Sequence, residues 1–331
     1  MSATAGRKGM KTAALTTSAV AALAAAVAVR RYARQAGGPG SDTSAAPVPP
    51  PLPPGRVLNL PGRGEVFVRD CGSTCASPAV LLLHGWTASG DINFFPAYAQ
   101  LAESYRVIAL DLRGHGRGMR STEPFTLEDC ADDAAALLGL LGTGRVIVVG
   151  YSMGGPVGML LARRHPERVA ALVMQATALE WHRTARERAV WRMLPVFDLG
   201  VRFGAGAAMT QWLLRRAVEE APELDARRPW LAAEFRRATA RDLVSAGRAL
   251  SRYDALPWAG QLNLPAAMLV TTRDHLVRPA KQRELAKALR ASVLEIDADH
   301  DLPLVNGGEY ARLTRIAVDQ VAAAAGLAAS G

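Results

Sequence analysis

The feature that most constrains the fold is a regular alternation of short aliphatic runs and helical stretches. The runs are nearly continuous in Val, Leu, Ile and Ala, which is typical of strands buried on both faces of a parallel sheet. The stretches between them carry helix signals, such as the capping-box-like pair Thr126 and Asp129 and the stop at Gly142. This alternation predicts an α/β fold with a doubly wound, mostly parallel sheet. The strand-like runs are 65–70, 79–85, 106–111, 145–150, 169–176, 266–274 and 292–299.

Residues 178–260 interrupt this alternation. They are helical in character, rich in Arg and Trp, and contain no convincing strand. We expect an all-helical insertion that covers the C-terminal edge of the sheet as a cap; additional structural helices are the alternative. The α/β core then consists of residues 57–177 and 261–325. The arginines of the insertion are interpreted as solvated surface.

The first 56 residues differ from the rest of the chain. Residues 1–35 are basic and apolar, and residues 36–56 form a Gly- and Pro-rich linker. The uncharged stretch 12–29 would span about 27 Å as a helix, close to the roughly 30 Å hydrocarbon core of a bilayer. We expect either a transmembrane helix that anchors the protein to a membrane or a cleaved signal peptide that exports it; an unstructured or amphipathic tail is the third interpretation. The side of the membrane stays open.

Charge and cysteine content exclude two function classes. The net charge is +9, but six of these charges lie in residues 1–35, which contain no acidic residue. A DNA-reading domain would keep a basic stripe on its folded part, so nucleic acid is excluded as a partner. The three cysteines lack metal-ligand spacing, so no metal site is expected. Cys71 and Cys75 either close a small loop or remain thiols.

The strongest functional signal is GYSMGG, residues 150–155, which matches G-x-S-x-G. It lies directly between a predicted strand and a predicted helix, where the glycines permit a sharp turn that exposes Ser152. A Gly-rich turn with an incidental serine is the alternative. A serine hydroxyl becomes an effective nucleophile only with a general base, and the base needs an orienting carboxylate.

The candidate base is His300 and the candidate orienting acid is Asp274. Each follows one of the last two predicted strands, at the edge where the crevice of such a sheet lies. His275 neighbours Asp274, but we expect it to point away. Three further acids lie too close in sequence to His300 to orient it easily and are interpreted as solvated or loop-capping residues: Asp297, Asp299 and Asp301.

An oxyanion hole needs two N–H donors aimed at the developing negative charge. We expect one from the backbone of Met153, which follows the candidate nucleophile. The other would come from the backbone of Trp86, in the loop after the run 79–85; a plain tight turn is the alternative. Trp86, Tyr151 and Trp181 are the candidate substrate-binding residues.

Together these motifs resemble the α/β-hydrolase superfamily, in its HG-x type with a serine at the nucleophile position and a helical cap. The resemblance rests on HGWTASG (84–90), DLRGHGRG (111–118), GYSMGG, Asp274 and His300, and covers roughly residues 57–322. It implies that Asp111 and its turn shape a loop. The chain order of serine, acid and histidine is the one this fold uses.

The resemblance implies a serine carboxylesterase or lipase that cleaves small-molecule or lipid esters through an acyl-serine and needs no cofactor. Members with the same triad also act on thioesters, on C–C bonds or as cofactor-free perhydrolases. A non-catalytic member that only binds a ligand is the second alternative. Dehalogenases and epoxide hydrolases carry Asp at the nucleophile position, so Ser152 argues against those activities.

Overall fold

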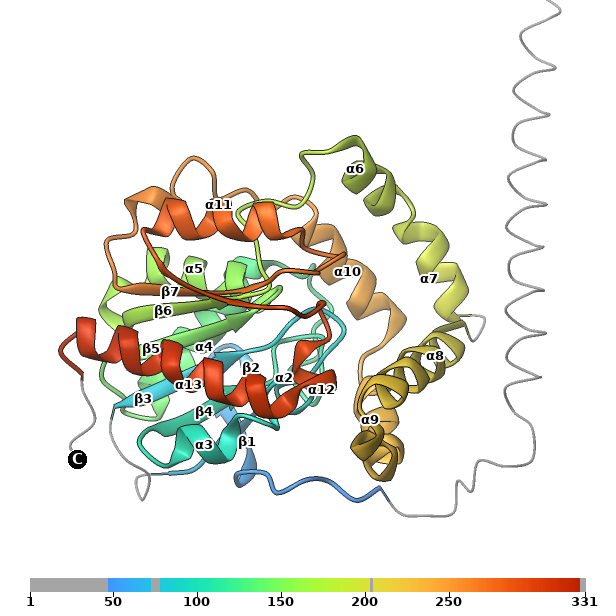
Figure 1. Cartoon of the computed structure of the whole chain (residues 1–331), viewed down its shortest axis with the longest axis horizontal. Coiled ribbons are helices and arrows are strands. Elements are labelled where there is room, and N and C mark those ends of the chain that lie inside the picture. The colour runs from blue at the N-terminus through green and yellow to red at the C-terminus, as the bar shows by residue number, and fades with distance from the viewer. Residues whose placement is uncertain (1–46, 73–77, 203–204, 328–331) are drawn as a thin grey trace, which may run out of the picture.

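The computed structural model describes residues 47–72, 78–202 and 205–327. One eight-stranded sheet forms its centre, in the order β1-β2-β4-β3-β5-β6-β7-β8, with helices on both faces (Figure 1). The pairs β1–β2 and β2–β4 are antiparallel and all later pairs are parallel, which confirms the predicted doubly wound, mostly parallel sheet. The strands are β1 (Gly55–Leu60), β2 (Gly64–Asp70), β3 (Ala79–Leu83), β4 (Arg106–Leu110), β5 (Val146–Tyr151), β6 (Val169–Gln175), β7 (Ala266–Thr271) and β8 (Ser292–Ile296).

The sheet separates two hydrophobic clusters, because successive side chains of a strand point to opposite faces. In β3, Leu81 and Leu83 belong to one cluster, while Val80 and Leu82 belong to the other. The helices of the core that supply the first cluster are α4 (Leu127–Leu140), α5 (Gly154–Arg164) and α11 (Pro279–Leu289). Those that supply the second are α2 (Gly90–Phe94), α3 (Tyr98–Ala102), α12 (Leu302–Val305) and α13 (Gly307–Ala324). The segment between β6 and β7 adds residues to both clusters.

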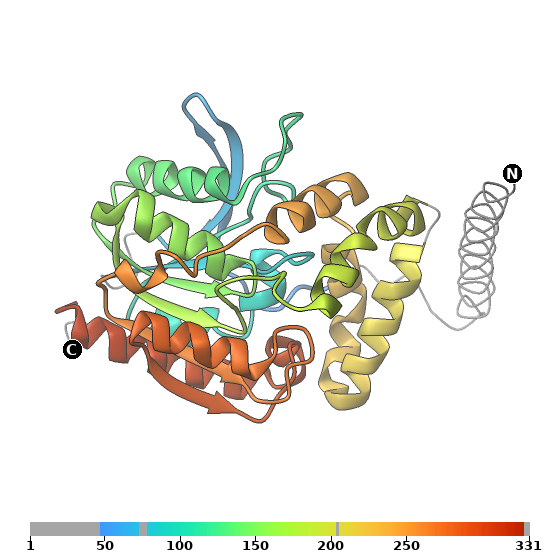
Figure 2. The same cartoon turned by 90° about the horizontal axis from the view of Figure 1, so that it is seen from above.

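The segment between β6 and β7 is helical, and Figure 2 shows its helices gathered at one end of the sheet. Within its described residues the only strand-like pairing is an isolated bridge between Glu180 and Asp254. Its role as a cap stays a prediction. The helices are α6 (Ala185–Arg192), α7 (Leu194–Arg202), α8 (Ala205–Glu220), α9 (Arg228–Phe235) and α10 (Ala240–Leu250), with short 3-10 turns at Pro222–Arg227 and Ala259–Gln261.

Two local details show how the sequence sets the element boundaries. The Thr126 side chain accepts a hydrogen bond from the Asp129 N–H, so α4 begins at the predicted cap. The strand β1 was not among the predicted runs, because it follows directly on the proline-rich linker and four of its six residues are exposed. It is stabilised by antiparallel pairing with β2 across a short turn in which Gly62 adopts φ 72°.

The prediction of a membrane anchor is wrong. Among the residues that the structure describes, none of the helices combines the length and the apolar character needed to cross a membrane. The predicted span, residues 12–29, lies outside the described residues. We therefore withdraw the transmembrane helix, the membrane as a partner, and the localisation inferred from residues 1–35.

The cysteines differ in their bonding state. Cys71 is disulfide-bonded, and Cys75 lies outside the described residues. Cys130 is buried and free, packed among the apolar residues of α4. Within the described ranges, no group of three or more His, Cys, Asp and Glu side chains is arranged to hold a metal ion.

Candidate active site

Ser152 lies in the sharp turn between β5 and α5. Its backbone has a φ of 52°, in the left-handed region that costs free energy for any residue with a Cβ. The turn depends on glycines: a Cβ on Gly150 would lie 2.5 Å from the Gly154 carbonyl oxygen, and one on Gly154 would collide with the carbonyl of Leu83. The Ser152 N–H donates to the Gln175 carbonyl of β6 at 2.9 Å. The strained serine is therefore held in place by both neighbouring strands.

His300 and Asp274 complete a hydrogen-bonded chain with Ser152. His300 Nε2 lies 3.1 Å from Ser152 Oγ, and His300 Nδ1 lies 2.8 Å from Asp274 Oδ2. The carboxylate accepts the Nδ1 proton, which leaves Nε2 free to accept the serine proton. The Asp274 side chain is fully buried, and that of His300 is 18% exposed. The structure thus brings together the three residues predicted as nucleophile, base and orienting acid, and their catalytic roles are proposals.

The Asp274 carboxylate is fixed on both oxygens. Its Oδ1 accepts the backbone N–H groups of Leu276 and Val277 at 2.8 and 2.7 Å. Its Oδ2 also accepts the Thr271 hydroxyl at 2.9 Å and the Gln282 amide at 3.1 Å. Gln282 lies in α11 and is completely buried. Sequence reasoning missed it, because a glutamine in an ordinary helix carries no motif.

The loop that carries His300 is fixed from two sides. The Tyr151 hydroxyl donates to the His300 carbonyl at 2.8 Å. The carboxylate of Asp299 accepts the N–H groups of His300 and His275 at 2.7 and 3.0 Å, which joins the loop after β8 to the loop after β7. Partial burial opposes the charge of Asp299, but these hydrogen bonds hold its pKa below the ordinary value. The His275 side chain points to solvent and is 80% exposed.

The two predicted oxyanion donors belong to segments that adjoin Ser152. Met153 is the N-cap residue of α5, and amides at the start of a helix have no carbonyl partner within it. Trp86 follows Gly85, which lies so close to the nucleophile that a Cβ there would be 3.1 Å from the Ser152 Cβ. The Gly85 N–H donates to the Asn93 side chain at 2.8 Å, which fixes this loop. The oxyanion role of both amides stays a prediction.

His84 joins the loop after β3 to the loop 111–118. Burial, followed by the nearby His115, lowers the pKa of His84 to about 3, so its ring is neutral. The Leu112 N–H donates to its Nε2 at 2.9 Å, and its Nδ1 lies 2.8 Å from the Gly85 carbonyl oxygen. This arrangement places the proton on Nδ1 and gives the His84 side chain a structural role.

The predicted substrate-binding residues have different surroundings. The Trp86 indole donates to the Leu243 carbonyl of α10 at 2.8 Å, and its ring lies 5.7 Å from that of Trp191. The Nε1 of Trp181 is buried without a hydrogen-bond partner among the described residues. Tyr151 is 2% exposed, so its described contacts are with His300 rather than with an open pocket. The substrate-binding roles of all three stay predictions.

Comparisons with known proteins agree with this architecture. A family model described as the alpha/beta hydrolase fold matches residues 78–306. The solved structure of an enol-lactonase from Burkholderia xenovorans LB400 is similar, with a TM-score of 0.68 and 25% identity, over 78% of this chain and 98% of that one.

Two curated proteins show where the sequence similarity lies. The chain is 27% identical over 205 residues to 3-oxoadipate enol-lactonase 2 of Acinetobacter baylyi, which covers 61% of this chain and 74% of that protein. It is 34% identical over 112 residues to 2-(acetamidomethylene)succinate hydrolase of Mesorhizobium japonicum, but spans only 39% of that protein. These relatives are hydrolases, and they support a hydrolase activity for this chain.

Proposed function

Because the chain belongs to the alpha/beta hydrolase fold family, we propose that it is a serine hydrolase that cleaves carboxylic esters through an acyl-serine intermediate. The observation that carries this proposal is the continuous hydrogen-bonded chain from Ser152 through His300 to Asp274. A strained serine, an imidazole and a buried carboxylate in this order supply a nucleophile, a base and its orienting group.

In the first half of the proposed reaction, the Ser152 hydroxyl attacks the ester carbonyl carbon. His300 Nε2 takes the serine proton as the new C–O bond forms, and Asp274 stabilises the resulting imidazolium. The N–H groups of Met153 and Trp86 would bind the negative oxygen of the tetrahedral intermediate. Collapse of the intermediate breaks the bond to the alcohol, which leaves with the proton from His300. The product of this half is an acyl-serine.

In the second half, water replaces the alcohol. His300 removes a proton from a water molecule as it attacks the acyl-serine, and a second tetrahedral intermediate forms at the same position. Its collapse returns the proton to Ser152 and releases the carboxylic acid. Every proton therefore moves through His300 Nε2, and the chemistry requires no redox step.

One observation supports an ester as the reacting group, and a second one connects the site to the helical segment. The relatives reported above include two enol-lactonases, and a lactone is a cyclic ester. The loop after β3 also joins the site to the helical segment, because Trp86 hydrogen-bonds to α10 and contacts Trp191 of α6. We propose that residues 178–260 act as a cap that shapes the acyl pocket next to Ser152.

Covalent labelling of the full chain tests this proposal. A fluorescent fluorophosphonate should label the parent protein and fail to label Ser152→Ala, because the reagent needs an activated serine. Hydrolysis of a short-acyl and a long-acyl nitrophenyl ester, followed in parallel, should vanish in Ser152→Ala and His300→Ala. His165→Ala is the matched control, since His165 bonds to Asp132 at the end of α5, away from the strand C-terminal ends.

The outcomes separate the proposed activity from its alternatives. Labelling together with ester turnover supports the esterase, and the better acyl chain begins to define the pocket. Labelling without ester turnover keeps Ser152 as a nucleophile but contradicts ester cleavage, and directs the search to thioesters, C–C bonds or peracid formation. A folded protein that fails to react with the fluorophosphonate would overturn the catalytic proposal in favour of ligand binding.

A further inference from the structure

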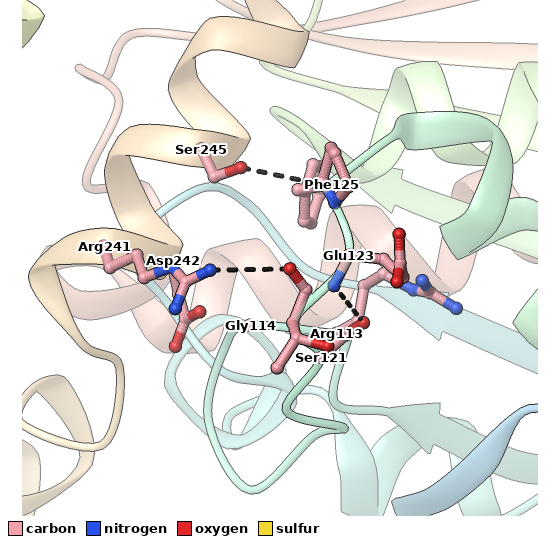
Figure 3. Close-up of a pocket in the computed structure, with 10 residues that line it drawn as sticks. Arg113, Gly114, Ser121, Glu123, Phe125, Arg241, Asp242 and Ser245 are labelled. Carbon is pink, nitrogen blue, oxygen red and sulfur yellow. Dashed lines mark hydrogen bonds between the residues drawn. The ribbon is translucent and has the colours of Figure 1, made fainter.

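Two cavities outside the triad differ in whether their charged side chains have partners within the protein. The first, of about 250 Å³, lies between loop 113–125 and α10 (Figure 3). Its charged side chains are already engaged: Arg113 pairs with Asp133 at 2.8 Å, and Arg241 donates to the Thr122 carbonyl at 3.4 Å. Asp242 lies 3.7 Å from Arg120. This cavity lies between the core and the helical segment, and Arg113, Arg241 and Asp242 find their partners within the protein.

The second cavity, of about 500 Å³, is strongly basic. It lies between the start of the helical segment, including α6, and the residues that follow α10. Among the described residues, no Asp or Glu lines it. Its lining residues are His182, Arg188, Trp191, Arg192, Ser251 and Arg252.

The arginines of this second cavity lack acidic partners. Arg188 donates only to backbone carbonyls, those of His182 and Arg183. Arg192 and Arg252 make no side-chain hydrogen bond or ion pair in the described part of the chain. Three guanidinium groups around one hollow repel one another, because arginine stays protonated in proteins. A bound anion would convert this repulsion into attraction. All three arginines are exposed, which agrees with their interpretation as solvated surface, and the cavity that they line is open to solvent.

A further feature makes the cavity suitable for an organic anion. Trp191 supplies an apolar wall, and its indole is held by donation to the Trp181 carbonyl at 2.5 Å. Guanidinium groups bind carboxylate and phosphate oxygens with paired, charge-assisted hydrogen bonds.

We infer that this cavity binds the anionic end, a carboxylate or phosphate, of the ester substrate, an assignment that rests on the proposed function. Two tryptophan side chains connect this cavity to the loop next to Ser152. Trp191 lines the cavity and contacts Trp86, which follows the glycine packed against Ser152. The substrate class is then an ester or lactone that carries a negative charge remote from the carbonyl that is cleaved.

A pair of esters with the same acyl length tests this inference. The mono-nitrophenyl ester of glutarate carries a terminal carboxylate, and nitrophenyl pentanoate carries a methyl group at the same position. We expect Arg192→Gln combined with Arg252→Gln to lower kcat/KM for the glutarate ester about 10- to 100-fold, the range of hydrogen bonds to charged groups. The pentanoate should change less than about twofold, because neither arginine touches the triad.

The matched control is Arg186→Gln. Arg186 also lies in α6 and is exposed, but it is outside the cavity lining, so its substitution removes one charge from this helix, as Arg192→Gln does. Its effect on the glutarate ester should be less than about twofold. An equal loss in the control and in the double variant would overturn the inference, since long-range attraction would then explain both. Equal losses for the two esters, or no loss for either, would also overturn it.

A binding measurement separates this inference from the proposed function. Glutarate and inorganic phosphate are titrated by calorimetry onto Ser152→Ala, with and without the two arginine substitutions. Binding that disappears with the arginines supports the site, and the stronger of the two anions identifies its ligand chemistry. Absence of binding to Ser152→Ala overturns the site. If the parent protein cleaves no ester while glutarate still binds through the arginines, the proposed function fails and the anion site stands.

Discussion

The strand ends around Ser152 and the helices α6–α8 differ in how deeply their side chains are buried. At the strand ends the Asp274 carboxylate is fully buried and interacts with five polar groups. Among the described residues, thirteen large apolar side chains are exposed, and seven of them lie along α6–α8: Val190, Met193, Val196, Leu199, Met209, Trp212 and Leu213. We expect the first region to set the rate of bond cleavage and the second to set the choice of substrate.

The core and the helical segment also meet at a buried ion pair of α9. Glu234 of α9 has a fully buried side chain and pairs with Arg117 of the core loop at 2.5 Å. It also pairs with Arg237 at 3.0 Å and lies 3.3 Å from the Ser89 hydroxyl. Ser89 belongs to the same loop as Trp86, so this pair connects the helical segment directly to a predicted oxyanion donor.

The largest expected effect tests whether cleavage depends on the strand ends alone. Ser152→Ala should lower kcat about 10⁶-fold, because loss of the nucleophile disables the whole triad. Nitrophenyl ester hydrolysis measures the rate, and circular dichroism checks that the variant is folded. A residual rate within a hundredfold of the parent would mean that another group performs the chemistry.

The next effect concerns the junction between the two regions. Glu234→Gln should lower the free energy of unfolding by about 3 kcal/mol, because two arginines lose a buried carboxylate. Urea denaturation measures the change. Glu309→Gln is the matched control: its pair with Arg312 is exposed at the surface of α13, and its loss should leave the free energy of unfolding nearly unchanged. Equal costs for the two variants would show that burial of the junction contributes nothing.

Much of the strand-end region could be predicted from the sequence, and little of the helical segment could. The nucleophile turn needs glycines at Gly150 and Gly154 because the backbone passes too close for a Cβ, and that need is written into the motif. The residues that hold the triad in position could not be predicted from the sequence. Gln282 touches Asp274, and Asp299 links two loops, only because distant segments fold together. The convergence of arginines from α6 and from the end of α10 has the same origin.

A third prediction uses the pH dependence of stability. Burial is the main cause that lowers the pKa of His115 to about 4, so the folded state keeps this ring neutral. The unfolded chain takes up the proton below about pH 6.5. Stability is therefore lost as the pH falls from about 6.5 toward 4, by about 2 kcal/mol at pH 5. Asp111 opposes this trend, because burial raises its pKa to about 6 and the folded state binds its proton.

The contribution of His115 is isolated by substitution. Urea denaturation at pH 7 and pH 5 should give a smaller difference in His115→Phe than in the parent, by about 2 kcal/mol. Asp111 is present in both proteins, so its opposite effect cancels in this comparison. An unchanged difference would mean that the ring is protonated in the fold.

The smallest effect sharpens the comparison between rate and substrate choice. Tyr151→Phe removes the hydroxyl that donates to the His300 carbonyl at 2.8 Å, from a side chain that is almost completely buried. We expect kcat to fall about fivefold, equivalent to about 1 kcal/mol, with KM unchanged. The loss should be equal for the glutarate and pentanoate esters, unlike the selective loss expected from the cavity arginines. Tyr310→Phe is the control, because its hydroxyl donates to Gln175 and leaves His300 untouched. A change in KM, or a loss confined to one ester, would show that Tyr151 contacts the substrate, and the division of labour between strand ends and helical segment would then fail at its centre.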